Sequence, residues 1–107
     1  MTALRDRRCV PCRGGVPALA APQIQALLAE VPQWTVSDGR LRRRFDFADF
    51  AAAIAFVNAI AAIAEAEDHH PDFCVHYRQV DVTIWTHAVG GLTENDFVLA
   101  AKIDAVG

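Results

Sequence analysis

The sequence of 107 residues lacks most of the marks of a secreted or zinc-binding protein. It has three cysteines, an odd number, and Cys9 and Cys12 form one CxxC motif with no second pair to complete a zinc site. We interpret them as reduced thiols. The opening residues also lack the apolar core of a signal peptide, so secretion is not expected and a cytoplasmic location is predicted.

No apolar run is long enough to span a bilayer. The most apolar stretch, residues 50–64, is about half alanine, contains Asn58 and falls short of the ~20 residues that a spanning helix needs. The formal net charge is −3, which gives no reason to expect nucleic acid or an anionic membrane as a partner. These absences favour one soluble globular domain.

Hydrophobic periodicity predicts three helices and two hairpins. The expected elements are a helix between Pro22 and Pro32, strands on either side of Asp38-Gly39, a helix from Asp49 to about His69, strands on either side of Arg78-Gln79, and a helix capped by Thr93. This order, α-β-β-α-β-β-α, predicts an α+β fold with two layers, in which a four-stranded antiparallel sheet carries helices on one face. Residues 1–21 are expected to form an irregular arm, with Val16 and Leu19 docking on a single domain of residues 22–107.

The helix over residues 49–69 has an unusually wide apolar arc. Two adjacent stripes cover close to half of its circumference, and they consist of Phe50, Ile54 and Val57 beside Phe56, Ile60 and Ile63. An ordinary surface helix has a narrower apolar face. We therefore expect a homodimer or homotetramer that associates through this helix and the sheet edges.

Two adjacent histidines, His69 and His70, precede Pro71 at the end of this helix. Because a residue before proline is pushed out of the helical region, the helix is expected to end near His69. Glu65 lies one turn before His69 and is expected to orient its ring. His87 ends a predicted strand just before a glycine pair, at a position where functional residues are common.

Several imidazoles in one cavity would suit proton transfer, because an unperturbed imidazole has a pKa of ~6.5. Two other interpretations stay open. In the first, the histidine pair caps the helix carbonyls; in the second, it belongs to a metal site. The spacing of Glu65, His69 and His87 matches no zinc pattern, so no metal is expected. His76, in the middle of a strand, is expected to be structural.

These residues resemble the motif of one family, the pterin-4a-carbinolamine dehydratases. The matching positions are Glu65, His69-His70-Pro71, Phe73, Thr86-His87 and the segment GLTEND ending at Asp96. Five polar positions recur in order over some thirty residues, and the predicted order of elements agrees with the family fold. Three positions depart from the usual pattern: Phe73 replaces a frequent tryptophan, Asn95 a frequent arginine, and Trp85 a smaller residue.

The resemblance implies dehydration of a 4a-hydroxytetrahydropterin to the quinonoid dihydropterin, with no metal or organic cofactor. It implies that His69 and His87 are general acids and that His70 chiefly binds the pterin. Supporting or binding roles are implied for Glu65, Pro71, Phe73, Thr86 and Asp96. Asp96 equally fits a capping box with Thr93.

Two alternatives to catalysis remain at this point. Mammalian members of the family also act as dimerisation cofactors for a transcription factor, so a non-catalytic binding protein of the same fold is possible. A relative that works near pterin or molybdopterin metabolism without dehydratase activity is another alternative.

Overall fold

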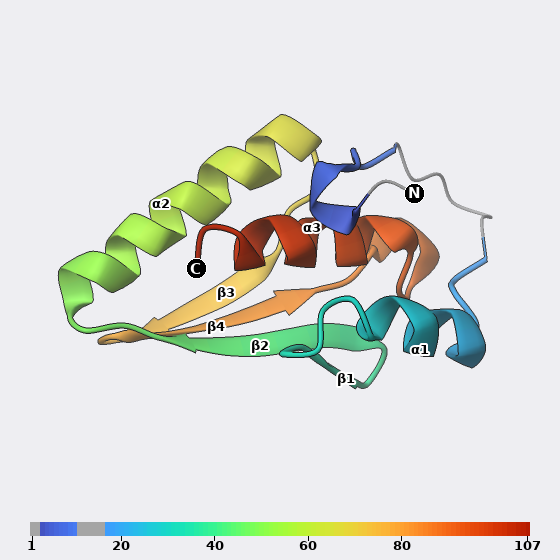
Figure 1. Cartoon of the computed structure of the whole chain (residues 1–107), viewed down its shortest axis with the longest axis horizontal. Helices are drawn as coiled ribbons and strands as arrows, with labels where there is room; N and C mark the ends of the chain where they lie inside the picture. The colour runs from blue at the N-terminus through green and yellow to red at the C-terminus, as the bar shows by residue number, and fades with distance from the viewer. Residues whose placement is uncertain (1–2, 11–16) are drawn as a thin grey trace.

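The computed structural model describes residues 3–10 and 17–107, which form an α+β domain with helices packed over one antiparallel sheet (Figure 1). The helices are α1 (Ala21–Leu28), α2 (Phe50–Glu67) and α3 (Glu94–Asp104). The strands are β1 (Thr35–Ser37), β2 (Arg40–Asp46), β3 (Asp72–His76) and β4 (Gln79–Ile84). Short 3₁₀ turns, η1 (Leu4–Asp6) and η2 (His87–Val89), precede α1 and α3 respectively. The predicted fold class and element order are confirmed.

The sheet has the strand order β1-β2-β4-β3, with every neighbouring pair antiparallel. Asp38 and Gly39 form the first hairpin turn with φ values of 54° and 70°. Two successive positive φ values suit the tight turns that match strand twist, which is why Asp-Gly is so common there. The second turn lies at Tyr77 and Arg78, one residue earlier than expected, with Tyr77 at φ 56°.

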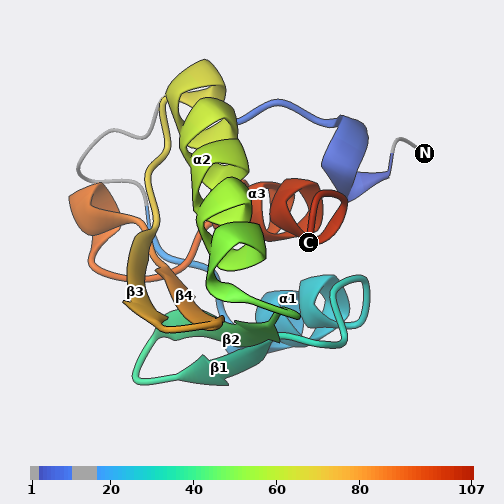
Figure 2. The same cartoon turned by 90° about the vertical axis from the view of Figure 1, so that its left-hand side faces the viewer.

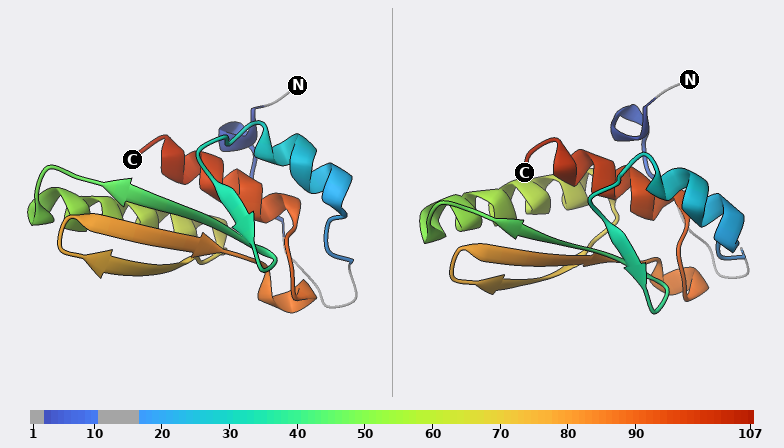
Figure 3. Two further views of the ribbon diagram at one scale, coloured as in Figure 1. Left: turned by 90° about the horizontal axis from the view of Figure 1, so that it is seen from below. Right: turned by 60° about the horizontal axis from the view of Figure 1, so that its bottom comes forward.

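The core lies between the sheet and the helices, which cover one face of the sheet (Figure 2). From the sheet it receives Leu41, Phe45, Val80, Val82 and Ile84. From the helices it receives Ala53, Phe56 and Ile60 of α2 and Phe97, Val98, Leu99, Ala100 and Ile103 of α3. Seen from below, the strands lie in front of α2 and α3 (Figure 3). Burial alternates along β4, where Val80, Val82 and Ile84 are all buried.

Helix α2 begins and ends at identifiable residues. The Oδ1 atom of Asp49 accepts a hydrogen bond from the Ala52 amide at 2.8 Å, so Asp49 is the N-cap of the helix. The helix ends at Glu67, because Asp68 adopts the left-handed conformation with φ 51°. This end is two residues earlier than predicted. His69 and His70 therefore leave the helix together and enter the loop before β3.

The outer side of α2 stays partly apolar and accessible. Phe50 is 50% exposed, and Ile54, Val57 and Ile63 are half-buried. By length and composition alone α2 could cross a membrane, contrary to the expectation that no apolar run is long enough. The core helix of a soluble protein meets the same criteria, however, and α2 places Phe56 in the core of this domain.

The N-terminal segment packs against α3 rather than extending away from the domain (Figure 1). Leu4 is only 3% exposed and belongs to the core. Leu19 docks as predicted, with its amide donating to the Leu92 carbonyl at 2.8 Å. Val16 and Cys12 lie outside the described residues. The division into an arm of residues 1–21 and a domain of residues 22–107 stays a prediction.

Candidate active site

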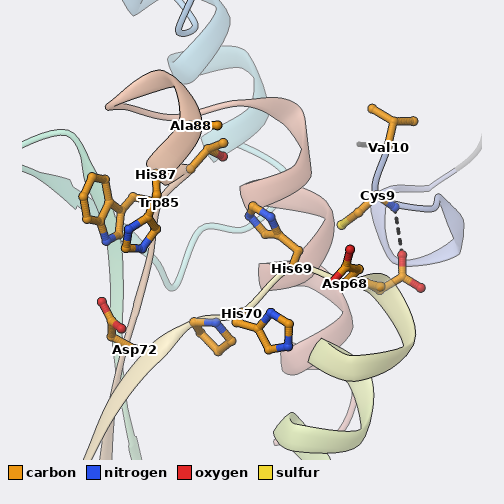
Figure 4. A pocket seen from close by; sticks show the side chains of 12 residues that line it. Cys9, Val10, Asp68, His69, His70, Asp72, Trp85, His87 and Ala88 are labelled. Atoms are coloured by element: carbon orange, nitrogen blue, oxygen red, sulfur yellow. Dashed lines mark hydrogen bonds between the residues drawn. The ribbon is translucent and has the colours of Figure 1, made fainter. Parts of the chain in front are cut away.

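A pocket of about 630 Å³ opens where three segments meet (Figure 4). The loop after α2 contributes His69, His70 and Pro71. The segment after β4 contributes Trp85, Thr86 and His87, and the N-terminal segment contributes Cys9 and Val10. Figure 4 shows Trp85 and His87 across the pocket from His69 and His70. The structure thus brings all three predicted catalytic histidines to one cavity.

His69 is held by a buried carboxylate. Its Nε2 atom lies 2.6 Å from Oδ1 of Asp96, and the two side chains are 12% and 0% exposed. Because an ionised carboxylate only accepts hydrogen bonds, this contact places a proton on Nε2. The opposite ring nitrogen, Nδ1, is not used by this contact.

Asp96 also accepts hydrogen bonds from two neighbouring threonines. Its Oδ2 atom accepts hydrogen bonds from the Thr86 hydroxyl and from the Thr93 amide, each at 2.8 Å. The Thr93 contact is the one that the predicted capping box requires. The capping role and the histidine contact are therefore compatible, because each uses a different carboxylate oxygen.

Glu65 contacts a different histidine from the one expected. Its Oε2 atom lies 2.6 Å from Nε2 of His70, and both side chains are largely exposed. The expectation that Glu65 orients His69 is wrong. It assumed that the helix continues to His69, whereas the left-handed Asp68 ends the helix first and redirects His69 toward α3.

His87 belongs to a stack of three side chains. Its ring centroid lies 3.9 Å from that of Trp85, with an angle of 32° between the planes. The guanidinium of Arg40 lies over the Trp85 ring as well, 4.4 Å from its centroid. Among the described residues the buried Trp85 Nε1 atom has no hydrogen-bond partner, so these ring contacts are what orient the indole.

Two residues considered in the sequence lie elsewhere. Phe73 is 41% exposed on the edge strand β3 and pairs with the buried Val82, so it lies on the helix-covered side of the sheet. It is not among the described residues that line the histidine pocket. His76 lies on the other face, which the helices leave open, with Nε2 at 3.4 Å from Oδ2 of Asp81. On that face the hydrogen bond from Arg44 holds the pKa of the Asp81 carboxyl below its usual range.

Sequence reasoning missed six residues that line the pocket: Cys9, Val10, Glu67, Asp68, Asp72 and Ala88. The sequence could have suggested Asp72, because it follows the histidine pair by two positions. Nothing in the local sequence connects Cys9 and Val10 with the rest of the pocket, which begins at Glu67. Among the residues that the structure describes, no three His, Cys, Asp or Glu side chains are grouped as a metal site would need.

Comparisons with known proteins point to one family. The family model described as pterin 4 alpha carbinolamine dehydratase matches residues 17–106. A protein of Halorhodospira halophila that is assigned to this family by name is 49% identical over 107 residues, covering 98% of each chain. One of Rubrobacter xylanophilus, assigned in the same way, is 45% identical over 105 residues, covering 97% of this chain and 98% of the relative.

Two solved structures are also similar. A transcriptional coactivator/pterin dehydratase from Brucella melitensis superposes with a TM-score of 0.80 at 35% identity, covering 83% of this chain and 97% of that chain. A pterin dehydratase-like protein identified as a RuBisCO assembly factor in the alpha-carboxysome gives a TM-score of 0.57 at 30% identity, covering 68% of this chain and 84% of that chain. The matched region includes every histidine of the pocket, and the chain belongs to the pterin-4-alpha-carbinolamine dehydratase family.

Proposed function

We propose that this protein dehydrates a 4a-hydroxytetrahydropterin to the quinonoid dihydropterin and so recycles an oxidised pterin cofactor. In this reaction the N5 lone pair expels the hydroxyl at C4a. The hydroxyl takes up a proton and leaves as water, and the ring system then loses a proton. Imidazole is suited to both proton transfers near neutral pH. Membership of the family and the three histidines around one pocket support the proposal.

His69 and His87 are the proposed acids. Asp96 fixes the ring of His69 through Nε2 and leaves Nδ1 for the substrate, while the stack with Trp85 fixes the plane of His87. Their positions across the pocket from each other would place a proton donor on either side of a bound pterin (Figure 4). His70, exposed and paired with Glu65, has the proposed role of binding the substrate.

The convergence of three imidazoles from two distant segments is the observation that carries this proposal. A histidine that only caps a helix needs no second or third imidazole in the same cavity. The pocket volume of about 630 Å³ lies within the range of sites for small molecules.

A stopped-flow assay tests the proposal. The carbinolamine is generated by an aromatic amino acid hydroxylase, and its absorbance is followed in the presence of the purified protein. We expect His69→Ala and His87→Ala each to lower kcat by roughly 10²–10⁴, the usual contribution of a general acid. His76→Ala is the matched control, because His76 lies on the open face of the sheet. Parent rates in both pocket variants would refute the proposed mechanism.

We also propose that the protein is a homodimer or homotetramer. The partly exposed apolar side of α2 supports this, as do the edge strands β1 and β3, whose outer edges have no neighbouring strand in the described sheet. Sedimentation at micromolar concentration tests it, and a single species of 11.7 kDa would contradict it.

A cytoplasmic location is proposed as well. Cys9 and Cys74 are thiols in the structure, which suits a reducing compartment. Fractionation of the producing cells, with the protein recovered outside the soluble cytoplasmic fraction, would contradict this assignment.

A binding role is the second candidate function. The two solved relatives described as a coactivator/pterin dehydratase and as an assembly factor favour it, and the accessible side of α2 offers an apolar surface for a partner protein. Stoichiometric co-purification with one partner, together with no dehydratase activity, would favour binding over catalysis.

A further inference from the structure

We infer that Cys9 and Val10, at the end of the N-terminal segment Ala3–Val10, form a fixed wall of the histidine pocket, and that Asn95 is the positioning residue that holds them there. The inference rests on the proposed function for the identity of the ligand. The docking itself rests on contacts between residues that lie more than 80 positions apart in the sequence.

Asn95 makes two hydrogen bonds with the backbone of Val10. Its Oδ1 atom accepts a hydrogen bond from the Val10 amide at 2.9 Å, and its Nδ2 atom donates to the Val10 carbonyl at 2.6 Å. The residue is only 4% exposed. A side-chain amide that bonds both polar groups of one residue fixes its position and its orientation, much as a neighbouring strand does.

The adjacent residue of the segment is held by the end of α2. The amide of Cys9 donates to Oε1 of Glu67 at 2.8 Å, a contact drawn in Figure 4. Glu67 is the last residue of α2 and also lines the pocket. The segment therefore bridges α2 and α3 at the place where Asp96, which follows Asn95, holds His69.

Two further contacts hold the same segment at positions that lie outside the pocket. Arg7 pairs with Glu94 at 2.6 Å, and the Lys102 ammonium donates to the Arg5 carbonyl at 2.8 Å. Both are exposed. Removing one of these contacts loosens the segment outside the pocket. It therefore serves as a control for the loss of the Asn95 contacts.

The expected consequence concerns binding rather than proton transfer. Cys9 and Val10 line the pocket together with the histidines, so release of the segment would open one side of the cavity. The acids and the carboxylate behind His69 would remain in place. Loss of the Asn95 contacts should therefore raise KM for the carbinolamine and leave kcat nearly unchanged.

The experiment uses the full chain with Cys12→Ser and Cys74→Ser, so that Cys9 is the one remaining cysteine. Alkylation of Cys9 by N-ethylmaleimide is followed by mass spectrometry, with and without 7,8-dihydrobiopterin. Asn95→Ala should raise the alkylation rate and KM by about ten-fold each, as expected from the loss of one or two hydrogen bonds, with kcat within two-fold. In the chain that keeps Asn95, the ligand should slow alkylation.

Lys102→Ala is the control, since it removes an exposed contact of the same segment, and its KM should match that of the parent. Asn95→Asp has the same size and provides a second variant if Asn95→Ala does not fold. It replaces the donor to the Val10 carbonyl with an acceptor, so it should change KM and alkylation in the same direction.

Equal alkylation rates in the folded Asn95 variants and the control would overturn the inference. Faster alkylation with an unchanged KM would overturn it too, because the segment would then leave without affecting the pocket. If the parent protein shows neither dehydratase activity nor protection by the ligand, the proposed reaction is wrong. The role of Asn95 is then decided by the alkylation ratio alone: a ten-fold difference from Lys102→Ala supports it, and equality refutes it.

Discussion

Replacing Asp96 with asparagine tests the proposed acid chemistry at its most buried point. The change keeps the size of the side chain and exchanges one carboxylate oxygen for an NH₂ group. One oxygen of Asp96 accepts a hydrogen bond from the Thr93 amide, which can only donate. The oxygen of asparagine must therefore stay at that position, and the new NH₂ group must face His69.

This orientation reverses the hydrogen bond to the ring. With aspartate, Nε2 of His69 carries a proton, and in the proposed mechanism Nδ1 exchanges one with the substrate. With asparagine, Nε2 must accept a hydrogen bond, so the neutral ring carries its proton on Nδ1. Donation of that proton would leave an imidazolate, which is not accessible near neutral pH. His69 would be locked in a tautomer that is useless as an acid, as in catalytic triads whose aspartate is replaced.

The magnitudes follow from these contacts. Loss of the charge at one buried hydrogen-bonded site should lower the free energy of unfolding by about 1–3 kcal/mol. Most of the protein should then stay folded, because domains of this size are stable by roughly 5–15 kcal/mol. If His69 is a general acid, kcat should fall by roughly 10²–10⁴. A change in activity this large cannot come from a minor unfolded fraction.

Urea unfolding and the stopped-flow dehydratase assay together measure both effects. The matched control is Asp49→Asn, the same substitution at the N-cap of α2, where asparagine caps as well as aspartate. It should keep the parent rate and stability. A folded Asp96→Asn protein with a rate within two-fold of the parent would show that His69 does not carry the catalytic proton.

Two further predictions concern Trp85 and the open face of the sheet. Trp85→Leu removes the ring that stacks on His87 at 3.9 Å, and kcat/KM should fall about ten-fold, in line with the ~0.5–1.5 kcal/mol of an aromatic pair; parity with the parent would show that His87 needs no such support. Because the Arg44 hydrogen bond lowers the pKa of Asp81 in the folded protein, its stabilising effect is present above the ordinary carboxyl pKa of ~3.9 and is lost as the pH falls through the lower folded value. The urea concentration at the unfolding midpoint should therefore fall less for Arg44→Gln than for the parent below about pH 4. Parallel curves of midpoint against pH would contradict this.

The fold was predictable from the sequence because its signals are local. Asp38-Gly39 forms the expected hairpin turn, and Asp49 caps α2 through its own side chain. Each of these signals acts within about four residues, which is the range over which sequence patterns are informative. One of the two apolar stripes expected on α2 contains Phe56 and Ile60, and both lie in the core.

The partners of the histidines were not predictable in the same way. The expected contact between Glu65 and His69 assumed a regular helix, and one left-handed residue, Asp68, was enough to exchange the partners. Aspartate adopts this conformation more readily than most residues, but the sequence does not show when it will. The contact of Val10 with Asn95 spans 85 positions and has no local signal at all.

Asp96 shows why a choice between a structural and a functional role can be misleading. From the sequence, the capping box and the support of a histidine are alternatives. In the structure one carboxylate serves both, because Oδ2 receives the Thr93 amide while Oδ1 faces His69. The N-terminus of α3 and the ring of His69 are thereby fixed by the same buried group. A substitution that weakens the cap must then also move the ring, so stability and activity should change together at this position, whereas at Asp49 they should not.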